Sequence, residues 1–141
     1  MMALIPDSHK DLLERPVYVT LTTVLPDGQP QSSIVWWDSD GDYVRINTTR
    51  GRQKEKNMRR NARVSILALD PENPYRWLEV RGTVEDITPD GAVEHIEKLS
   101  QKYQGKIYYG GFAPAERRGQ EERLTVKIRP TKVVIFPNRP R

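Results

Sequence analysis

The positive charge of this chain is concentrated in one short stretch. Residues 45–63 hold eight basic side chains and one acid, Glu55, which gives the stretch a net charge of +7. The whole chain carries +4, so everything outside the stretch sums to −3. The positive charge is therefore a local feature and not a general property of the protein.

The same stretch spans a change in local pattern. Residues 43–46 alternate apolar and polar side chains as a strand does, and 52–63 runs without Pro or Gly as a helix does. Between them the strand pattern is broken by Asn47, Thr48, Thr49 and Gly51. The first N–H groups of a helix lack partners, the helix dipole favours an anion there, and Lys or Arg adds full charge. The pattern predicts an anion-binding site. The alternative is a basic helix that only presents a solvated face.

Length and composition exclude several classes of protein. With 141 residues the chain is expected to form one domain, residues 1–141, with a loose tail at 138–141. It contains no apolar run of about 18 residues that would span a membrane, and its first residues do not resemble a signal peptide. It has no cysteine and only two histidines, so neither disulfides nor a zinc site is expected. We therefore expect a cytoplasmic protein without a metal site.

The remaining pattern is that of short strands separated by turns. Strands are predicted over 17–25, 29–37, 42–47, 62–69, 75–87, 124–128 and 131–136. The first three are expected to form a meander, with turns at 26–28 and 38–41. Gly82 is expected to mark a bulge or bend, and Pro130 to separate the last two strands. The prediction is a mainly β or α+β fold, a barrel of six or seven mostly antiparallel strands with two or three helices.

Two further helices are predicted, one before the first strand and one after the fifth. A short one runs to about Arg15, and a longer one begins at Thr88, which caps it, with Pro89 in the first position. Ala92, Ile96, Leu99 and Tyr103 share helical spacing and form the buried stripe of the longer helix. The glycine-rich segment 104–120 follows as an irregular loop.

Three motifs in this order resemble a known family. They are PDGQPQSS in the first hairpin, TTRGRQKEKNMRRNARVSI through the basic stretch, and WLEVRGTVEDIT in the long fifth strand. Together they resemble the pyridoxamine 5'-phosphate oxidase-like split β-barrel flavoproteins, and most of all their F-420-dependent oxidoreductase branch, over residues 8–137. The resemblance implies an oxidoreductase and a homodimer with two cofactor sites at the subunit interface. It implies coenzyme F-420, a deazaflavin, or alternatively FMN.

The resemblance also implies which residues hold the cofactor. Lys54 matches the phosphate-binding lysine, with Arg52 and Gln53 beside it and Asn57 one turn further along the helix. Asn47 and Thr48 match the end of the strand beneath the cofactor. Gln31, Ser33 and Val35 match the strand along the ring, and Tyr75 and Trp77 match residues that the partner chain contributes.

The chain departs from the family pattern in two places. Members often have a polar residue where Ile34 and Trp36 stand, so contacts with the ring at these positions would be made by backbone or by stacking. We find no counterpart of the basic residues that hold the substrate phosphate in the vitamin-oxidising members. This second departure weighs against pyridoxamine phosphate as the substrate.

Three functions remain open from the sequence. The first is transfer of a hydride between F-420 and a small, planar or conjugated substrate. F-420 carries a phosphate and a polyglutamate tail, and the surplus cations Arg50, Lys56, Arg59 and Arg60 suit that tail. The second is an FMN-dependent oxidase or reductase, and the third is a non-catalytic binder of a cofactor, of haem or of nucleic acid. The basic stretch lacks aromatic residues, so nucleic acid is not expected.

Other aromatic and histidine residues have structural interpretations beside functional ones. Of the adjacent Trp36 and Trp37, one should face the core, since neighbours in a strand point to opposite faces. Tyr75 and Trp77 form either a cross-strand pair or a wall against the ring across the dimer. The aromatic residues of 108–112 form either a mobile lid or a loop packed by its own side chains. His9 and His95 are expected on the surface, and no catalytic residue is assigned.

Overall fold

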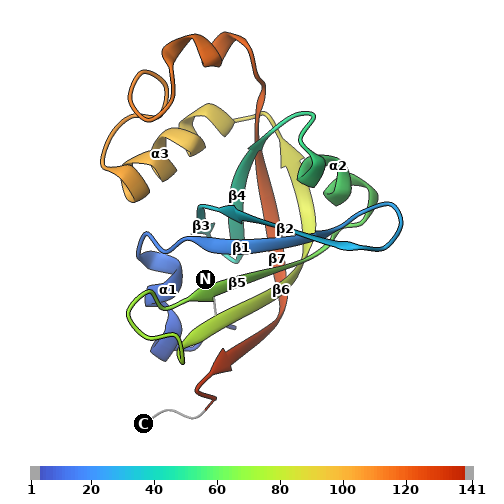
Figure 1. Cartoon of the computed structure of the whole chain (residues 1–141), viewed down its shortest axis with the longest axis vertical. Coiled ribbons are helices and arrows are strands. Elements are labelled where there is room, and N and C mark those ends of the chain that lie inside the picture. Colours follow the sequence, from blue (N-terminus) through green and yellow to red (C-terminus); the bar gives the residue numbers. More distant parts are fainter. Residues whose placement is uncertain (1–3, 139–141) are drawn as a thin grey trace.

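One antiparallel seven-stranded sheet organises the chain (Figure 1). The computed structural model describes residues 4–138. The strand order is β2-β1-β5-β6-β7-β4-β3, and the sheet curls like a split barrel without closing. The strands are β1 (Val19–Val24), β2 (Pro30–Val35), β3 (Trp37–Asp40), β4 (Tyr43–Thr49), β5 (Arg63–Leu69), β6 (Trp77–Thr88) and β7 (Arg123–Phe136). The predicted α+β split-barrel class is confirmed.

Short helices lie around this sheet. A 3-10 turn, η1 (Asp7–His9), leads into α1 (Asp11–Glu14), close to the predicted first helix. The basic helix α2 (Gln53–Arg60) lies within the predicted range, and α3 (Ala92–Gln104) and the 3-10 turn η2 (Ala115–Gly119) come before β7. In the described part of the chain no helix has the length and apolar character needed to cross a membrane. All but the first residue of the predicted loose tail lies outside the described residues.

The predicted three-strand meander is wrong. β1 and β2 form the expected hairpin, but β4 pairs with β3 and β7 instead of β2. The chain leaves β2 at Trp36 and re-enters the sheet at the opposite edge as β3, whose residues 38–40 were predicted as a turn. The break lets Trp37 become fully buried, with its Nε1–H donating to the Leu12 carbonyl at 3.2 Å. Long-range packing of Trp37 thus overrides a continuous strand pattern.

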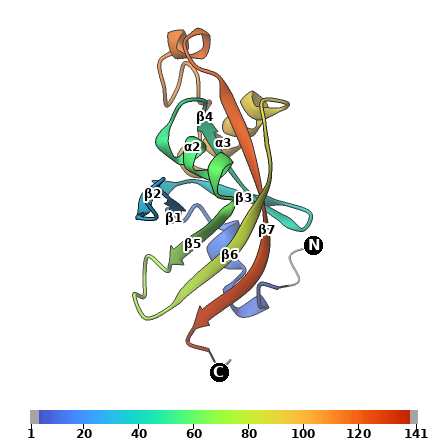
Figure 2. The same ribbon diagram turned by 90° about the vertical axis from the view of Figure 1, so that its right-hand side faces the viewer.

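The long strands β6 and β7 run side by side through most of the height of the molecule (Figure 2). The predicted irregularity at Gly82 is confirmed, because the register with β7 shifts between Arg81 and Gly82. A Cβ at Gly82 would lie 2.7 Å from the Arg129 carbonyl oxygen, so only glycine fits. Pro130 sits opposite Gly82 at this shift, and β7 continues through it. The predicted break into two strands is wrong because a proline is tolerated at a bulge.

The core lies on the inner face of the sheet, with a second apolar cluster under α3. The fully buried side chains include Trp37, Leu21 and Ile66. The predicted stripe of α3 is confirmed, since Ala92, Ile96 and Leu99 are buried and Tyr103 packs against the second cluster. This helix begins later than predicted, because β6 continues to Thr88, which pairs with Thr125, and Gly91 takes the N-cap position.

Candidate functional site

A cavity of about 300 Å³ lies where β4, the start of α2, α3 and the loop before β7 meet. Its polar lining consists of Asn47 and Thr48 at the end of β4 and of four cations, Arg52, Lys54, Arg117 and Arg123. Its apolar lining comes from the end of β2, from α3 and from the aromatic residues of the loop. A cationic wall therefore faces an apolar one, an arrangement suited to a ligand with an anionic arm and a flat ring.

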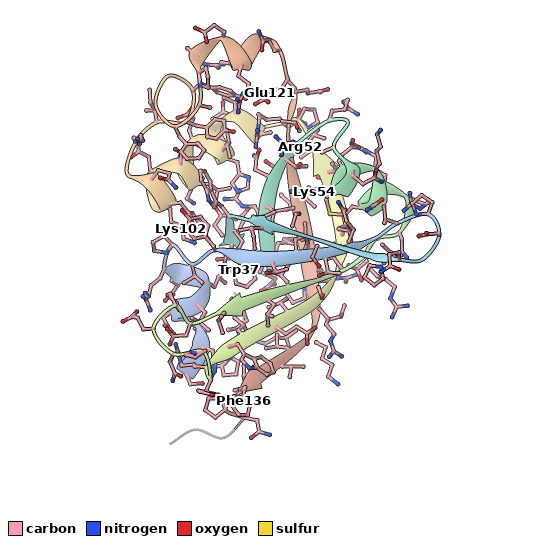
Figure 3. The ribbon with its side chains drawn as sticks, in the orientation of Figure 1. Trp37, Arg52, Lys54, Lys102, Glu121 and Phe136 are labelled. Carbon is pink, nitrogen blue, oxygen red and sulfur yellow. The ribbon has the colours of Figure 1, made fainter. Side chains whose placement is uncertain are left out.

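Five of the predicted cofactor residues line this cavity. They are Lys54, Arg52, Asn47, Thr48 and Val35. In Figure 3 Arg52 and Lys54 lie near each other at the upper end of the sheet, beside β4. The strand–turn–helix pattern brings them together because Gly51 takes a φ of +96°, which turns the chain from β4 into α2. The first helical residues are thereby directed at the cavity.

Lys54 is the most informative of these side chains. It is half-buried, and within residues 4–138 it has no hydrogen-bond or ion-pair partner. Burial, followed by the charges of Arg52 and Arg123, lowers the pKa of Lys54. A partly desolvated ammonium group without a carboxylate is costly, and an anion in the cavity would relieve that cost.

Thr48 provides a second unpartnered group among the residues that line the cavity. Its Oγ1 is buried and has no hydrogen-bond partner among the described residues. Buried hydroxyl groups in folded proteins nearly always have a partner. The unpaired ammonium group of Lys54 fits a ligand that carries hydrogen-bond acceptors, as a phosphate does, and the buried Thr48 hydroxyl is a second unsatisfied group among the lining residues.

Much of the remaining basic stretch is neutralised within the chain. Arg45 forms a bidentate pair with Asp38, and Arg50 pairs with Glu122. Arg59 pairs with Glu55, a carboxylate that also accepts from the Gly51 N–H at 2.8 Å. Arg60 donates to the carbonyl of Val24 and to Asn57. The cationic surplus available to a ligand tail is therefore smaller than the sequence count indicates.

Other predicted cofactor residues lie outside the cavity lining and bind one another. Asn57 is fully buried, and its Nδ2 donates to Thr23 Oγ1 at 3.0 Å and to Gln31 Oε1 at 3.1 Å. Gln53 Nε2 donates to Asn57 Oδ1 at 2.8 Å. These bonds fasten α2 to the β1–β2 hairpin and so hold Lys54 in place. Ser33 lies on the same face of β2 as Gln31 and pairs with Leu21 of β1.

Tyr75 and Trp77 lie far from the cavity of their own chain. Tyr75 is exposed in the turn before β6, and the ring of Trp77 stacks on Phe136 with centroids 5.6 Å apart. Figure 3 shows Phe136 at the end of the sheet opposite Lys54. Their predicted contact with a cofactor therefore requires a second chain.

The cavity includes residues that the sequence reasoning missed. Arg123 begins β7 opposite Thr49, so only strand pairing brings it beside the basic turn. Its Nε donates to Asn47 Oδ1 at 2.8 Å, and its guanidinium lies 5.1 Å from the centroid of the Tyr108 ring. Arg117 reaches the cavity from η2. No local pattern in the sequence marks these two arginines, because their positions depend on how the loop after α3 folds back.

The aromatic loop is packed by its own side chains, one of the two predicted alternatives. Tyr108 and Tyr109 are buried, and Trp36 packs against this loop through Phe112 at 5.1 Å between centroids. Trp36 also stacks on Tyr103 of α3 at 5.2 Å. Of the adjacent tryptophans, Trp37 is thus the core residue and Trp36 a cavity wall.

The prediction that both histidines lie on the surface is wrong. His9 is 3% exposed, with its Nε2 donating to the Phe136 carbonyl at 3.1 Å. His95 is 4% exposed and lies between Asp38 and Asn47. Both histidines are satisfied by partners distant in sequence, which helical spacing alone does not indicate.

The chain is similar to one family model and to several solved structures. A family model described as pyridoxamine 5'-phosphate oxidase matches residues 5–135. A solved structure named F420 reductase is 41% identical, with a TM-score of 0.80 over 92% of this chain and 98% of its own. Among curated proteins none matches.

Two further solved structures share the fold at lower identity. A conserved hypothetical protein from Mycobacterium tuberculosis is 23% identical, with a TM-score of 0.74 over 97% of this chain and 90% of its own. A candidate pyridoxamine 5'-phosphate oxidase from Listeria innocua is 21% identical, with a TM-score of 0.67 over 92% and 96%.

Proposed function

The chain belongs to the pyridoxamine 5'-phosphate oxidase family, and we propose that it is an F-420-dependent oxidoreductase of this family. In this proposal it transfers a hydride between the deazaflavin and a small planar or conjugated substrate. The 41% identity to a structure named F420 reductase, over nearly the full length of both chains, supports this choice of cofactor.

The observation that carries the proposal is Lys54, which lines the cavity and has no hydrogen-bond or ion-pair partner among residues 4–138. In the proposed complex Lys54 and Arg52 hold the phosphate of the cofactor. Each charge-assisted hydrogen bond is worth about 1.5–3 kcal/mol, so two or three supply most of a micromolar affinity of roughly −8 kcal/mol. The residues present therefore fit the anionic arm.

The apolar wall fits the ring of the same cofactor. Val35 and Ile34 end β2 beside Trp36, and all three line the cavity. Their side chains exclude water and position a flat ring by packing and stacking. When bound, F-420 supplies the hydride carrier, so the protein contributes placement and desolvation. We assign no catalytic residue to the chain.

FMN is the alternative cofactor, and the description of the matching family model favours it. FMN has one phosphate and a similar ring, so the same wall would accept it. Haem is less well supported. Both ring nitrogens of His9 and of His95 have hydrogen-bond partners in the protein, which leaves neither imidazole free as an axial ligand.

We also propose that the protein is a homodimer with its cofactor sites at the interface. The outer face of the sheet carries exposed apolar side chains in neighbouring rows. Leu69, Trp77 and Phe136 form one row across β5, β6 and β7, and Leu67 continues it two residues along β5. Ile34 is 62% exposed, lies on this face beside Thr20 and also lines the cavity. A second copy seated here would adjoin the cavity mouth.

A partner on this face gives Tyr75 and Trp77 a function. Tyr75 is 75% exposed in the turn beside this face, and it is not among the residues that line the cavity described above. In the proposed dimer these two residues complete the partner's cofactor site. The split-barrel domain of residues 1–141 and a cytoplasmic location remain part of the same proposal.

Titration of the purified protein with each cofactor tests the proposal. A colourless preparation that binds added F-420 with micromolar affinity, and FMN at least about tenfold more weakly, would support it. A yellow preparation that retains FMN through purification would instead assign the protein to the FMN alternative. Absence of binding for both would reject an oxidoreductase of either type.

A further inference from the structure

Four polar side chains from four elements form a continuous hydrogen-bonded chain behind the cavity. His95 of α3 donates from Nε2 to Asp38 Oδ1 of β3 at 3.0 Å. Asn47 of β4 donates from Nδ2 to His95 Nδ1 at 3.2 Å. Arg123 of β7 donates from Nε to Asn47 Oδ1 at 2.8 Å. The chain runs from the protein interior to a cation that lines the cavity.

The hydrogen bonds determine which ring nitrogen of His95 carries the proton. A carboxylate can only accept, so Nε2 carries a proton and donates it to Asp38. Asn47 Nδ2 can only donate, so Nδ1 offers its lone pair. Thr125 Oγ1, at 3.2 Å from Nδ1, is a second donor to that lone pair. This pattern is that of a neutral imidazole, which accepts toward the cavity and donates toward the interior.

Burial, more than the charges around it, favours the neutral form of the His95 imidazole. Burial is the largest effect and lowers the pKa of His95, while Asp38 acts to raise it. Asp38 is already held by both nitrogens of the Arg45 fork, at 3.0 and 2.8 Å. Arg45 and Lys98 lower the pKa of His95 further, and Lys102 also faces Asp38. The carboxylate therefore orients His95 without charging it.

The Asn47 amide has one orientation that satisfies all three of its partners. Its Nδ2 faces two acceptors, His95 Nδ1 and the Ala92 carbonyl at 2.9 Å, so its oxygen must face Arg123. The guanidinium of Arg123 is further held by Glu121 at 3.2 Å and lies over the Tyr108 ring. Arg123 is thereby fixed at the cavity wall in one position.

We propose that His95 is a positioning residue, which as a neutral imidazole fixes the Asn47 amide and through it holds the Arg123 guanidinium in place for an anionic ligand. A proton on Nδ1 would place two donors against each other and break the link to Asn47. The ligand-binding half of this inference rests on the proposed cofactor site. The positioning half concerns the free protein and is tested without any ligand.

Nitrogen NMR on the isotope-labelled free protein tests the positioning half. We expect His95 to show the neutral form with its proton on Nε2 near pH 7, and the Arg123 Nε–H to give a resolved, slowly exchanging signal. In His95→Leu that arginine signal should be lost, and in His95→Gln it should be retained, since one amide can both donate to Asp38 and accept from Asn47. An unchanged arginine signal in a folded His95→Leu protein would overturn the proposal.

A second variant keeps the test decisive if His95→Leu does not fold. Asn47→Asp places a carboxylate oxygen against His95 Nδ1, so His95 should take up a second proton near neutral pH. A His95 that stays neutral in this variant would overturn the proposal as well.

F-420 titration tests the ligand-binding half. The affinity of His95→Leu should fall by about fivefold, the equivalent of one ordinary hydrogen bond, and His95→Gln should recover it. Equal affinity in folded wild type and His95→Leu would reject this half. If the wild type binds neither F-420 nor FMN, the proposed function fails, while the NMR result still decides the positioning half.

Discussion

The ammonium group of Lys102 donates to the backbone carbonyl of Trp37 at 2.8 Å (Figure 3). The same group donates to the Leu13 carbonyl at 2.7 Å. Lys102 therefore ties α3 to α1 and to the point where the chain enters β3. A half-buried cation thus satisfies two backbone carbonyl oxygens, one in α1 and one in β3.

This contact predicts a rise in stability with pH. Burial lowers the pKa of Lys102 to about 8, below its ordinary value of 10.5. The unfolded chain therefore binds more protons than the folded chain between these two values, and the free energy of unfolding should increase as the pH rises from about 8 to about 10. Burial raises the pKa of Tyr103 and of Tyr109 to about 12, so these tyrosines oppose the trend only above about pH 10.

Urea unfolding at about pH 7.5 and about pH 9.5 checks this prediction. Lys102→Met should show a smaller rise than the wild type, and the rise that remains is that of Lys54, whose pKa burial also lowers. An equal change with pH in both proteins would mean that Lys102 titrates at its ordinary value.

The close approach of β6 and β7 predicts a strict requirement at Gly82. Gly82→Ala would place its Cβ 2.7 Å from the Arg129 carbonyl oxygen and from Ile128 Cγ2. Overpacking of this kind costs about 1–3 kcal/mol of unfolding free energy. Gly119→Ala is the matched control, since nothing lies within 4 Å of a Cβ there. Equal stability of the two variants in urea unfolding would show that β6 and β7 can move apart with little loss of unfolding free energy.

The polar network beneath α2 predicts a structural role for Asn57. Asn57→Ala leaves Thr23, Gln31 and Gln53 without their shared partner in a buried position. The free energy of unfolding should fall by about 1–3 kcal/mol, the usual cost of unsatisfied buried groups. Lys56→Ala, on the exposed side of the same helix, should change it by less than about 0.5 kcal/mol. If both variants changed the free energy of unfolding by a similar small amount, the hydrogen bonds of Asn57 would not be what holds α2 to the β1–β2 hairpin.

The apolar outer face of the sheet predicts a dimer. Light scattering should give roughly 33 kDa, twice the 16.3 kDa of one chain. Leu67→Asp, which adds a charge to the middle of this face, should give the monomer mass. Ile107→Asp changes an apolar side chain that is also exposed but lies outside the sheet, so this variant should remain dimeric. A monomeric wild type would remove the shared cofactor site from the account.

Local patterns predicted the parts of the fold that local interactions determine. The β1–β2 hairpin, the basic helix and the buried stripe of α3 all follow from turn residues and hydrophobic spacing. Local patterns do not predict the strand break at Trp36 or the burial of His95. The strand break at Trp36 exists because Trp37 fills the core, and His95 is buried because three other elements supply its partners. Neither cause is visible in a window of neighbouring residues.

The candidate site likewise contains residues that local sequence predicts and residues that only long-range contacts bring in. Asn47, Thr48, Arg52 and Lys54 are close in sequence, and one turn brings them to one cavity wall. Arg117 and Arg123 join them only through the fold of the loop after α3 and the pairing of β7 with β4. Contacts between segments distant in sequence therefore complete a site that the basic stretch begins.

The most direct test of the central claim compares F-420 binding by Lys54→Ala and by Lys56→Ala. Lys54 lines the cavity and has no partner among the residues that the structure describes, whereas Lys56 is exposed on the same helix and does not line the cavity. We predict that Lys54→Ala weakens F-420 binding by at least about tenfold, the loss of one charge-assisted bond, with little change in the melting temperature of the free protein. Lys56→Ala should bind as the wild type does. Equal F-420 affinity in wild type and Lys54→Ala would contradict the account.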